Sequence, residues 1–246
     1  MAQVTDAAPS LDQFVAQTWE GILDACTRCG RCVEVCPVVP FAPGLADADP
    51  KSVVGGVLDF MSASTPMNSA SDTWAKQCNG CGDCIPACPE HINPRQMLML
   101  ASSKIASVEH GTPDTFRKMS RAIRIMVSMQ LIPEDVARLL RPPPVRDVDV
   151  VFYTGCNPIR TPHVLFNVMT MLDVLDINYE VLGGPSSCCG IIQSKWEGDV
   201  KKGGRVSEQT LSRFGGYKPD KVLSWSPSCQ LHLGETIKGY REVSFD

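Results

Sequence analysis

Twelve cysteines are the residues of this 246-residue sequence best suited to chemistry, and eight of them fall into two strings with identical spacing. The first string runs from Cys26 to Cys36 and the second from Cys78 to Cys88, and each reads Cys-x2-Cys-x2-Cys-x3-Cys-Pro. Thiolates are soft ligands for zinc and for iron–sulfur clusters. Disulfides or zinc sites are the alternatives, but a duplicated four-cysteine string closed by proline favours cluster binding.

Bacterial ferredoxins hold two [4Fe–4S] clusters with this spacing, and the fourth cysteine of each string binds the cluster of the other string. The first predicted ligand set is Cys26, Cys29, Cys32 and Cys88. The second predicted set is Cys78, Cys81, Cys84 and Cys36. Gly30, Gly80 and Gly82 lie within the strings, where a tight turn requires dihedral angles that other residues avoid. The sequence therefore predicts two cubane clusters, each bound by three cysteines of one string and the fourth cysteine of the other.

The remaining cysteines lie in the C-terminal half, after predicted strands at 150–153, 178–182 and 221–225. Helices are predicted between these strands, at about 161–175 and 197–214. Because the carboxyl ends of parallel strands share one sheet edge, we expect the four thiols to converge there. They are Cys156, Cys188, Cys189 and Cys229. Convergence would make a metal or iron–sulfur centre; the alternative is four separate buried cysteines.

Helices must position the two strings in the N-terminal part. Ser10 and Gln13 form a capping-box pattern that starts an amphipathic helix leading to Cys26. A short helix is predicted at 51–60, a loop at 62–71, and helices that start at Pro94, at Thr112–Pro113 and at about 133. The prolines at 142–144 favour a stiff linker. The prediction is an α+β protein, with a mostly helical twin-[4Fe–4S] ferredoxin-like domain at 1–145 and a small parallel-sheet α/β domain at 146–246.

Composition limits the function classes. A net charge of −4 gives no basis for nucleic-acid binding, although residues 104–146 carry eight Lys/Arg against four acids. That basic segment predicts either a docking face for an acidic partner or a solvated helix face. No run of about 18 apolar residues predicts a membrane span, and the polar, acidic start is not a secretory signal. Reduced thiols and a cytoplasmic location are therefore expected.

The C-terminal cysteine pattern resembles a known family. Cys156, 31 further residues, the Cys188-Cys189-Gly190 triplet, and 38 residues before Cys229 resemble the CCG (cysteine-rich) domain of heterodisulfide reductases. This domain also occurs in the iron–sulfur subunits of glycolate and lactate oxidases. With the twin-cluster strings before it, the chain most resembles a heterodisulfide reductase-type iron–sulfur subunit, including those of sulfur-oxidising complexes, over about residues 10–235.

Two departures from the family pattern leave alternatives open. The family's noncubane cluster uses five cysteines and a closing Cys-x-x-Cys, whereas His232 stands here at the last position. His232 is either a nitrogen ligand or an ordinary helix residue, and the site could hold a cubane, a smaller cluster or zinc, or be empty. Catalytic subunits of the family carry two CCG units and this chain has one, so we expect it to pack against another CCG-bearing protein or against itself.

The resemblance implies an electron-transfer subunit of a heterodisulfide reductase-like complex. Electrons would pass through two cubanes between a flavoprotein partner and a CCG-type disulfide or sulfane-sulfur centre, within a hetero-oligomer. A glycolate or lactate oxidase subunit is the first alternative, and a scaffold or assembly subunit with structural zinc is the second. Neither Gly-x-Gly-x-x-Gly nor Gly-Lys-Ser/Thr occurs, so no flavin or nucleotide is expected on this chain.

Overall fold

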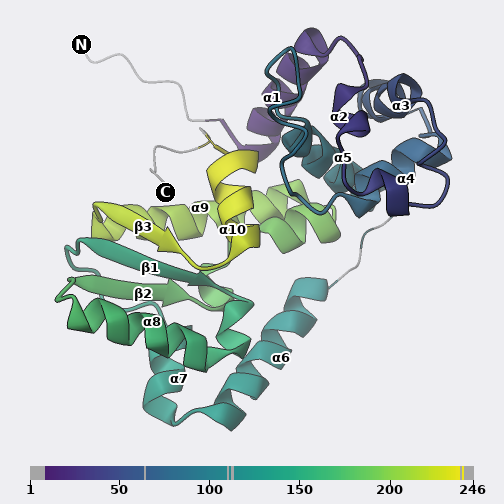
Figure 1. Cartoon of the computed structure of the whole chain (residues 1–246). Helices are drawn as coiled ribbons and strands as arrows, with labels where there is room; N and C mark the ends of the chain where they lie inside the picture. Colours follow the sequence, from purple (N-terminus) through teal and green to yellow (C-terminus); the bar gives the residue numbers. More distant parts are fainter. Residues whose placement is uncertain (1–8, 64, 110, 112–113, 239, 241–246) are drawn as a thin grey trace, which may run out of the picture. The chain divides into compact units, whose positions relative to one another are not determined.

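The computed structural model describes residues 9–63, 65–109, 111, 114–238 and 240, and the chain divides into two compact units, 1–111 and 112–246 (Figure 1). This division differs from the one predicted after residue 145. The helices before the proline stretch belong with the second unit, because the Phe116 amide donates to Glu197 Oε1 at 2.9 Å. Arg138 Nη2 likewise donates to the Tyr179 hydroxyl at 3.0 Å. The predicted helix start at Thr112–Pro113 lies outside the described residues.

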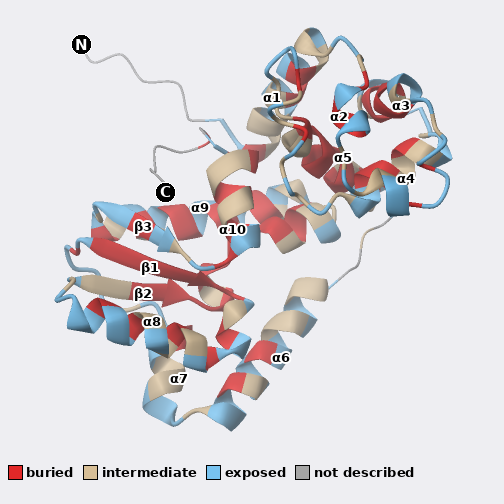
Figure 2. Ribbon diagram, viewed as in Figure 1, coloured by how far each residue is buried: buried red, intermediate tan, exposed pale blue. Residues whose placement is uncertain are grey.

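The first unit consists of helices joined by loops. Its elements are α1 (Leu11–Ala25), α2 (Arg31–Glu34), the 3₁₀ turn η1 (Val39–Phe41), α3 (Pro50–Ala63), α4 (Ser69–Gln77) and α5 (Pro94–Val108). Helix α1 begins with the predicted capping box: the Ser10 amide donates to Gln13 Oε1 at 2.8 Å, and the Gln13 amide donates to Ser10 Oγ at 3.4 Å. The helices enclose an apolar core in which Trp74 and Met97 are fully buried (Figure 2).

The region around helix α4 differs from the prediction, because the local sequence predicts a loop over residues 62–71. Instead α3 continues to Ala63 and α4 begins at Ser69. The Asn68 side chain caps α4 by accepting from the Ser71 amide at 2.8 Å, and Ser71 Oγ donates to the Val53 carbonyl at 2.8 Å. A serine-rich segment of weak helix propensity is helical here because capping and burial of its apolar side stabilise it.

The second unit is built on a three-stranded parallel sheet in the order β2-β1-β3 (Figure 1). The strands are β1 (Val150–Gly155), β2 (Tyr179–Gly183) and β3 (Lys221–Ser224), as predicted to within a few residues. The other elements are α6 (Thr115–Gln130), α7 (Pro133–Leu140), the 3₁₀ turns η2 (Pro158–Arg160) and η3 (Pro185–Ser187), α8 (Pro162–Val174), the π-helical turns η4 (Ile192–Trp196) and η5 (His232–Thr236), α9 (Val200–Tyr217) and α10 (Pro227–Leu231).

The central strand β1 is buried along its whole length, because neighbouring strands and helices cover it (Figure 2). Its Tyr153 ring meets the ring of Phe214 from α9 edge-on, with 5.0 Å between centroids. A mostly helical cysteine-bearing region followed by a small parallel sheet confirms the predicted fold class. None of the described helices combines the length and apolar run that a membrane span requires.

Candidate metal centres

The two cysteine strings fold into the same turn twice. Left-handed backbone occurs at the second and fourth positions after the leading cysteine in both strings, with φ of 57° at Arg28, 83° at Gly30, 78° at Gly80 and 94° at Gly82. Gly30 and Gly82 each accept a hydrogen bond at 2.9 Å from the amide three residues further on. Turns of this kind direct successive N–H groups into one concavity that suits an anion, including the sulfides of a cluster.

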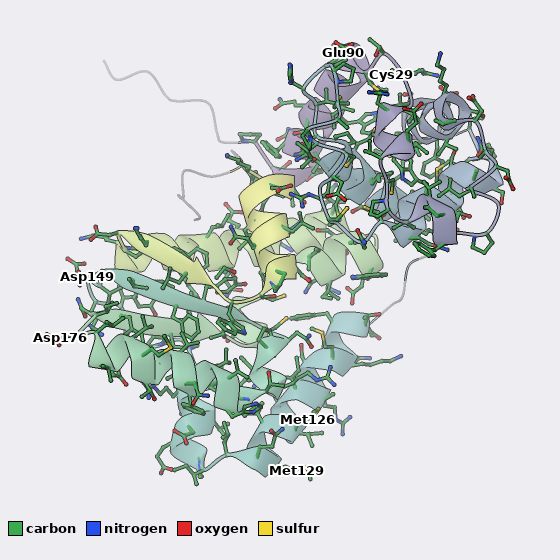
Figure 3. The ribbon with its side chains drawn as sticks, in the orientation of Figure 1. Cys29, Glu90, Met126, Met129, Asp149 and Asp176 are labelled. Atoms are coloured by element: carbon green, nitrogen blue, oxygen red, sulfur yellow. The ribbon has the colours of Figure 1, made fainter. Side chains whose placement is uncertain are left out.

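The first thiol set combines three cysteines of the first string with one of the second. Burial raises the pKa of Cys26, and the nearby thiols of Cys88 and Cys29 raise it further. Burial also raises the pKa of Cys32 to about 12, and Cys26 and Cys29 are among its neighbours. In Figure 3, Cys29 and Glu90 lie at the same end of the first unit. Four thiols that repel one another as thiolates need a cation to hold them deprotonated.

The second thiol set has the reciprocal composition. Burial raises the pKa of Cys84 to about 11, and Cys78, then Cys81 and Cys36, raise it further. Cys36 therefore lies among the cysteines of the second string, as Cys88 lies among those of the first. The charge of Cys84 also raises the pKa of Cys32, which indicates that the two cysteine sets are neighbours. A [4Fe–4S] cubane has a separate iron atom for each cysteine, and two such sets fit two cubanes.

Two arginines that sequence reasoning missed hold the strings in place. Arg95, at the start of α5, donates from Nη1 to the Gly80 carbonyl at 2.7 Å, and a side chain at Gly82 would meet the same guanidinium at 2.9 Å. Arg28 forms an ion pair with Asp59 of α3 at 2.8 Å. Neither arginine lies at a fixed sequence interval that predicts such a contact, so only the folded structure reveals these contacts.

The second unit brings its four cysteines together near the carboxyl ends of β1 and β2. Cys156 directly follows β1, and its Sγ lies 3.8 Å from Cys188 Sγ. Cys188 is hydrogen-bonded to Cys189, and Cys189 to Cys229 of α10. All four side chains are buried. Within the described residues, no three His, Cys, Asp or Glu side chains are arranged to hold a single metal ion.

Hydrogen bonding among these thiols shifts their pKa values in opposite directions. The hydrogen bonds with Cys156 and Cys189 lower the pKa of Cys188, and the one with Cys189 lowers that of Cys229. The hydrogen bond with Cys188 raises the pKa of Cys156 and of Cys189. The four thiols therefore titrate as a group and not as independent residues.

Polar groups outside the cysteines fix this centre, and sequence spacing does not identify them. The buried Tyr153 hydroxyl lies 2.9 Å from the Ser187 carbonyl, to which it donates, and 3.8 Å from Cys229 Sγ. Two hydroxyls of α9 reach the cysteine pair, with Ser207 Oγ and Thr210 Oγ1 each 2.7 Å from the carbonyl oxygen of Cys189 and Cys188, respectively. These bonds satisfy buried carbonyls and anchor the cysteine loop to a helix.

Replacing Thr210 with valine tests this anchoring, since the change keeps the side-chain shape and leaves the Cys188 carbonyl without its donor. We expect Thr210→Val to lower the free energy of unfolding by about 1–3 kcal/mol, the usual cost of an unsatisfied buried group. Thr170→Val is the matched control, because the Thr170 hydroxyl donates within α8 at an exposed position. Urea unfolding measures both variants, and equal losses would contradict a specific role for Thr210.

His232 is placed beside the cysteines rather than at the surface. Its side chain is buried, and it interacts electrostatically with Cys188. Burial lowers the pKa of His232 to about 4, so the imidazole is neutral, although Cys188 opposes this shift. Neither Nδ1 nor Nε2 has a hydrogen-bond partner within the described part of the chain. The sequence left the role of His232 open; the structure buries its ring about one helical turn after Cys229, and metal binding by this ring stays a prediction.

Comparisons with known proteins find a match within each unit. A family model for a 4Fe-4S dicluster domain matches residues 25–93, and a model for the CCG cysteine-rich domain matches residues 150–234. Among curated relatives, a component of the dihydromethanophenazine:CoB–CoM heterodisulfide reductase of Methanosarcina acetivorans is 25% identical over 208 residues. The corresponding protein of Methanosarcina mazei is 26% identical over 212 residues. No solved structure gives a significant match.

Each of these alignments covers 77% of this chain and 50% of the relative, so the chain spans about half the length of the curated relatives it matches. The eight cysteines of the dicluster match imply two [4Fe–4S] clusters. Residues 25–93 thus match a 4Fe-4S dicluster domain and residues 150–234 match a CCG domain, and the chain is distantly similar to one of the subunits of heterodisulfide reductase.

Proposed function

We propose that this chain relays electrons within a heterodisulfide reductase-like complex, between a flavin or cluster of a partner subunit and a disulfide or sulfane-sulfur centre of the CCG type. The two cubanes would be the relay. The proposed ligands of one are Cys26, Cys29, Cys32 and Cys88. The proposed ligands of the other are Cys36, Cys78, Cys81 and Cys84. The protein would set their potentials through burial and hydrogen bonds to sulfur.

The observation that carries this proposal is the presence of two kinds of thiol centre on one chain. The first unit holds two neighbouring four-cysteine sets, which suit one-electron transfer. The second unit holds four buried cysteines that contact one another in sequence near the carboxyl ends of β1 and β2, which suit sulfur chemistry or a further cluster. A relay joined to such a centre is an arrangement suited to the stepwise reduction or oxidation of a sulfur–sulfur bond.

For the second unit we propose a third iron–sulfur group held by Cys156, Cys188, Cys189 and Cys229. The donor set fits, because the four thiols are buried, Cys156 Sγ and Cys188 Sγ lie 3.8 Å apart, and thiolates are soft ligands for iron. When bound, such a group would add a redox-active iron site next to the sulfur substrate. Structural zinc, with the chain acting as a scaffold, is the competing interpretation.

The partners we propose are a flavoprotein and a protein with a further CCG domain. Among the described residues, the three-stranded sheet leaves β2 and β3 as edge strands. Unpaired edges invite packing by another chain. A heterodisulfide reductase-type flavoprotein should therefore copurify with the natively expressed chain. Copurification of a glycolate- or lactate-oxidising flavoprotein instead would replace this assignment with that of a hydroxyacid oxidase component.

The deciding experiment is anaerobic analysis of iron, sulfide and zinc, with EPR spectroscopy, on the wild type and on a Cys188→Ser/Cys189→Ser variant. We expect more than about eight iron atoms in the wild type, and about eight in the variant together with the loss of one EPR signal. Both proteins should retain the signals of the two cubanes, which serve as the internal control. About eight iron atoms in both proteins, with zinc lost only in the variant, would reject the third cluster and favour the scaffold.

A further inference from the structure

His232 occupies an unusual backbone element. It opens η5, in which the Ile237 amide donates to the His232 carbonyl at 3.0 Å, five residues away. Such π-helical turns are rare and often occur at functional sites. Turn η5 directly continues α10, which carries Cys229, so the His232 side chain follows the Cys229 side chain by about one helical turn. The backbone therefore places the imidazole on the cysteine side of the helix.

The segment that carries Cys188 and Cys189 has a similar arrangement. The pair Cys188 and Cys189 leads into η4, where the Glu197 amide donates to the Ile192 carbonyl at 3.0 Å across five residues. Two of the three cysteine-bearing segments of this centre thus lead into π-helical turns, while the Cys156 segment leads into the 3₁₀ turn η2. The imidazole of His232 is 2% exposed, so it is buried in the turn that directly continues the Cys229 helix.

The two ring nitrogens of His232 lack partners within the described residues, and this needs a physical cause. A buried polar group without a hydrogen bond is destabilising, and such a group in a native structure calls for an explanation, for example an unseen ion or water. An uncharged imidazole beside four thiols has its lone pair available to a metal, and imidazole is a good ligand for iron and zinc. A metal bound at this centre would therefore provide a partner for the ring nitrogen of His232 as well as for the cysteine sulfur atoms.

We infer that His232 is a nitrogen ligand of the iron–sulfur group at the CCG centre, which would then be held by four cysteines and one imidazole. This inference rests on the third iron–sulfur group of the proposed function. A neutral imidazole in place of a thiolate leaves the centre one unit less negative, and the same exchange raises the reduction potential in Rieske clusters. His232 would therefore set the potential of the centre as well as hold it.

Selective labelling with ¹⁵N-histidine tests the inference directly in the anaerobically purified full chain. We expect pulsed EPR of the paramagnetic state of the third group to show a ¹⁵N coupling in the wild type. The coupling should disappear in His232→Gln, with a lower iron content at this site. His163→Gln is the matched control, since His163 lies exposed on α8 of the same unit, and the coupling should persist in it.

A second variant keeps the test informative if His232→Gln loses the group altogether. His232→Cys offers a thiolate at the same position, so we expect the iron to be retained, the ¹⁵N coupling to vanish and the midpoint potential to become more negative. A wild-type third cluster without any histidine coupling would overturn the inference while leaving the proposed function intact. An iron content unaffected by Cys188→Ser/Cys189→Ser would instead reject the third group itself.

Discussion

Replacing Cys32 and Cys88 together should leave one [4Fe–4S] cluster in the first unit, whereas replacing Cys32 and Cys36 together should remove both. The reason is the exchange of ligands between the strings: Cys88 lies with the Cys26 set, and Cys36 with the Cys84 set. The first pair of alanine substitutions therefore damages one site twice, and the second pair damages two sites. We expect losses of about four and about eight iron atoms, respectively, by iron and sulfide analysis.

The comparison carries its own control. Both variants contain Cys32→Ala and one further cysteine replaced by alanine, so they differ only in which string supplies the second change. If each string instead bound its own cluster with all four cysteines, the ranking would reverse, and the Cys32/Cys36 variant would retain one cluster. EPR spectra of the two variants, recorded after reduction, report which signal survives independently of the iron count.

Gly155→Ala should strongly destabilise the second unit. Gly155 precedes Cys156 with φ of 66°, and an added Cβ would lie 2.9 Å from Cys229 Sγ. Left-handed backbone costs a non-glycine residue about 1–2 kcal/mol, and overpacking a filled core adds about 1–3 kcal/mol. We expect a loss of about 2–4 kcal/mol in unfolding free energy and disturbance of the Cys229 side of the centre.

Gly215→Ala provides the same chemical change without either problem. Gly215 lies exposed in α9, has right-handed backbone, and has no atom within 4 Å of the position a Cβ would take. Alanine there should be neutral or stabilise the chain by about 0.5–1 kcal/mol, because glycine is the poorer helix former. Urea unfolding of the two variants side by side would contradict the steric argument if Gly155→Ala were no worse than Gly215→Ala.

Sequence patterns predict the parts of this molecule that depend on short-range rules. The capping residues Ser10 and Gln13, the three strands and the two spaced cysteine strings each follow from local chemistry or a fixed interval. The division between units does not, because the contact of Phe116 with Glu197 joins residues 81 positions apart. The start of α4 was missed for the same reason, since part of its stabilisation comes from Ser71 bonding to a different helix.

Some residues of the candidate sites can likewise be predicted from the sequence, and others only from the folded structure. Cysteine spacing is a strong signal because iron–sulfur geometry fixes it, whereas the hydroxyls of Ser207 and Thr210 reach the CCG loop from an ordinary amphipathic helix. The position of His232 three residues after Cys229 was visible, but not whether its ring pointed inward. That depends on burial and on the lack of a competing hydrogen bond among the described residues, which only the folded chain shows.

The π-helical turns make the centre unusually sensitive to chain length. A π turn accommodates about one residue more than the corresponding α-helical turn, so deleting one residue within η5 would let ordinary helix form without breaking the chain. Each residue contributes about 100° of rotation in an α-helix. A deletion or insertion of one residue between Cys229 and His232 would therefore rotate the ring by about 100° relative to Cys229 and out of the proposed cluster site. Related chains could therefore gain or lose this ligand through one change in length, with no substitution at the histidine itself.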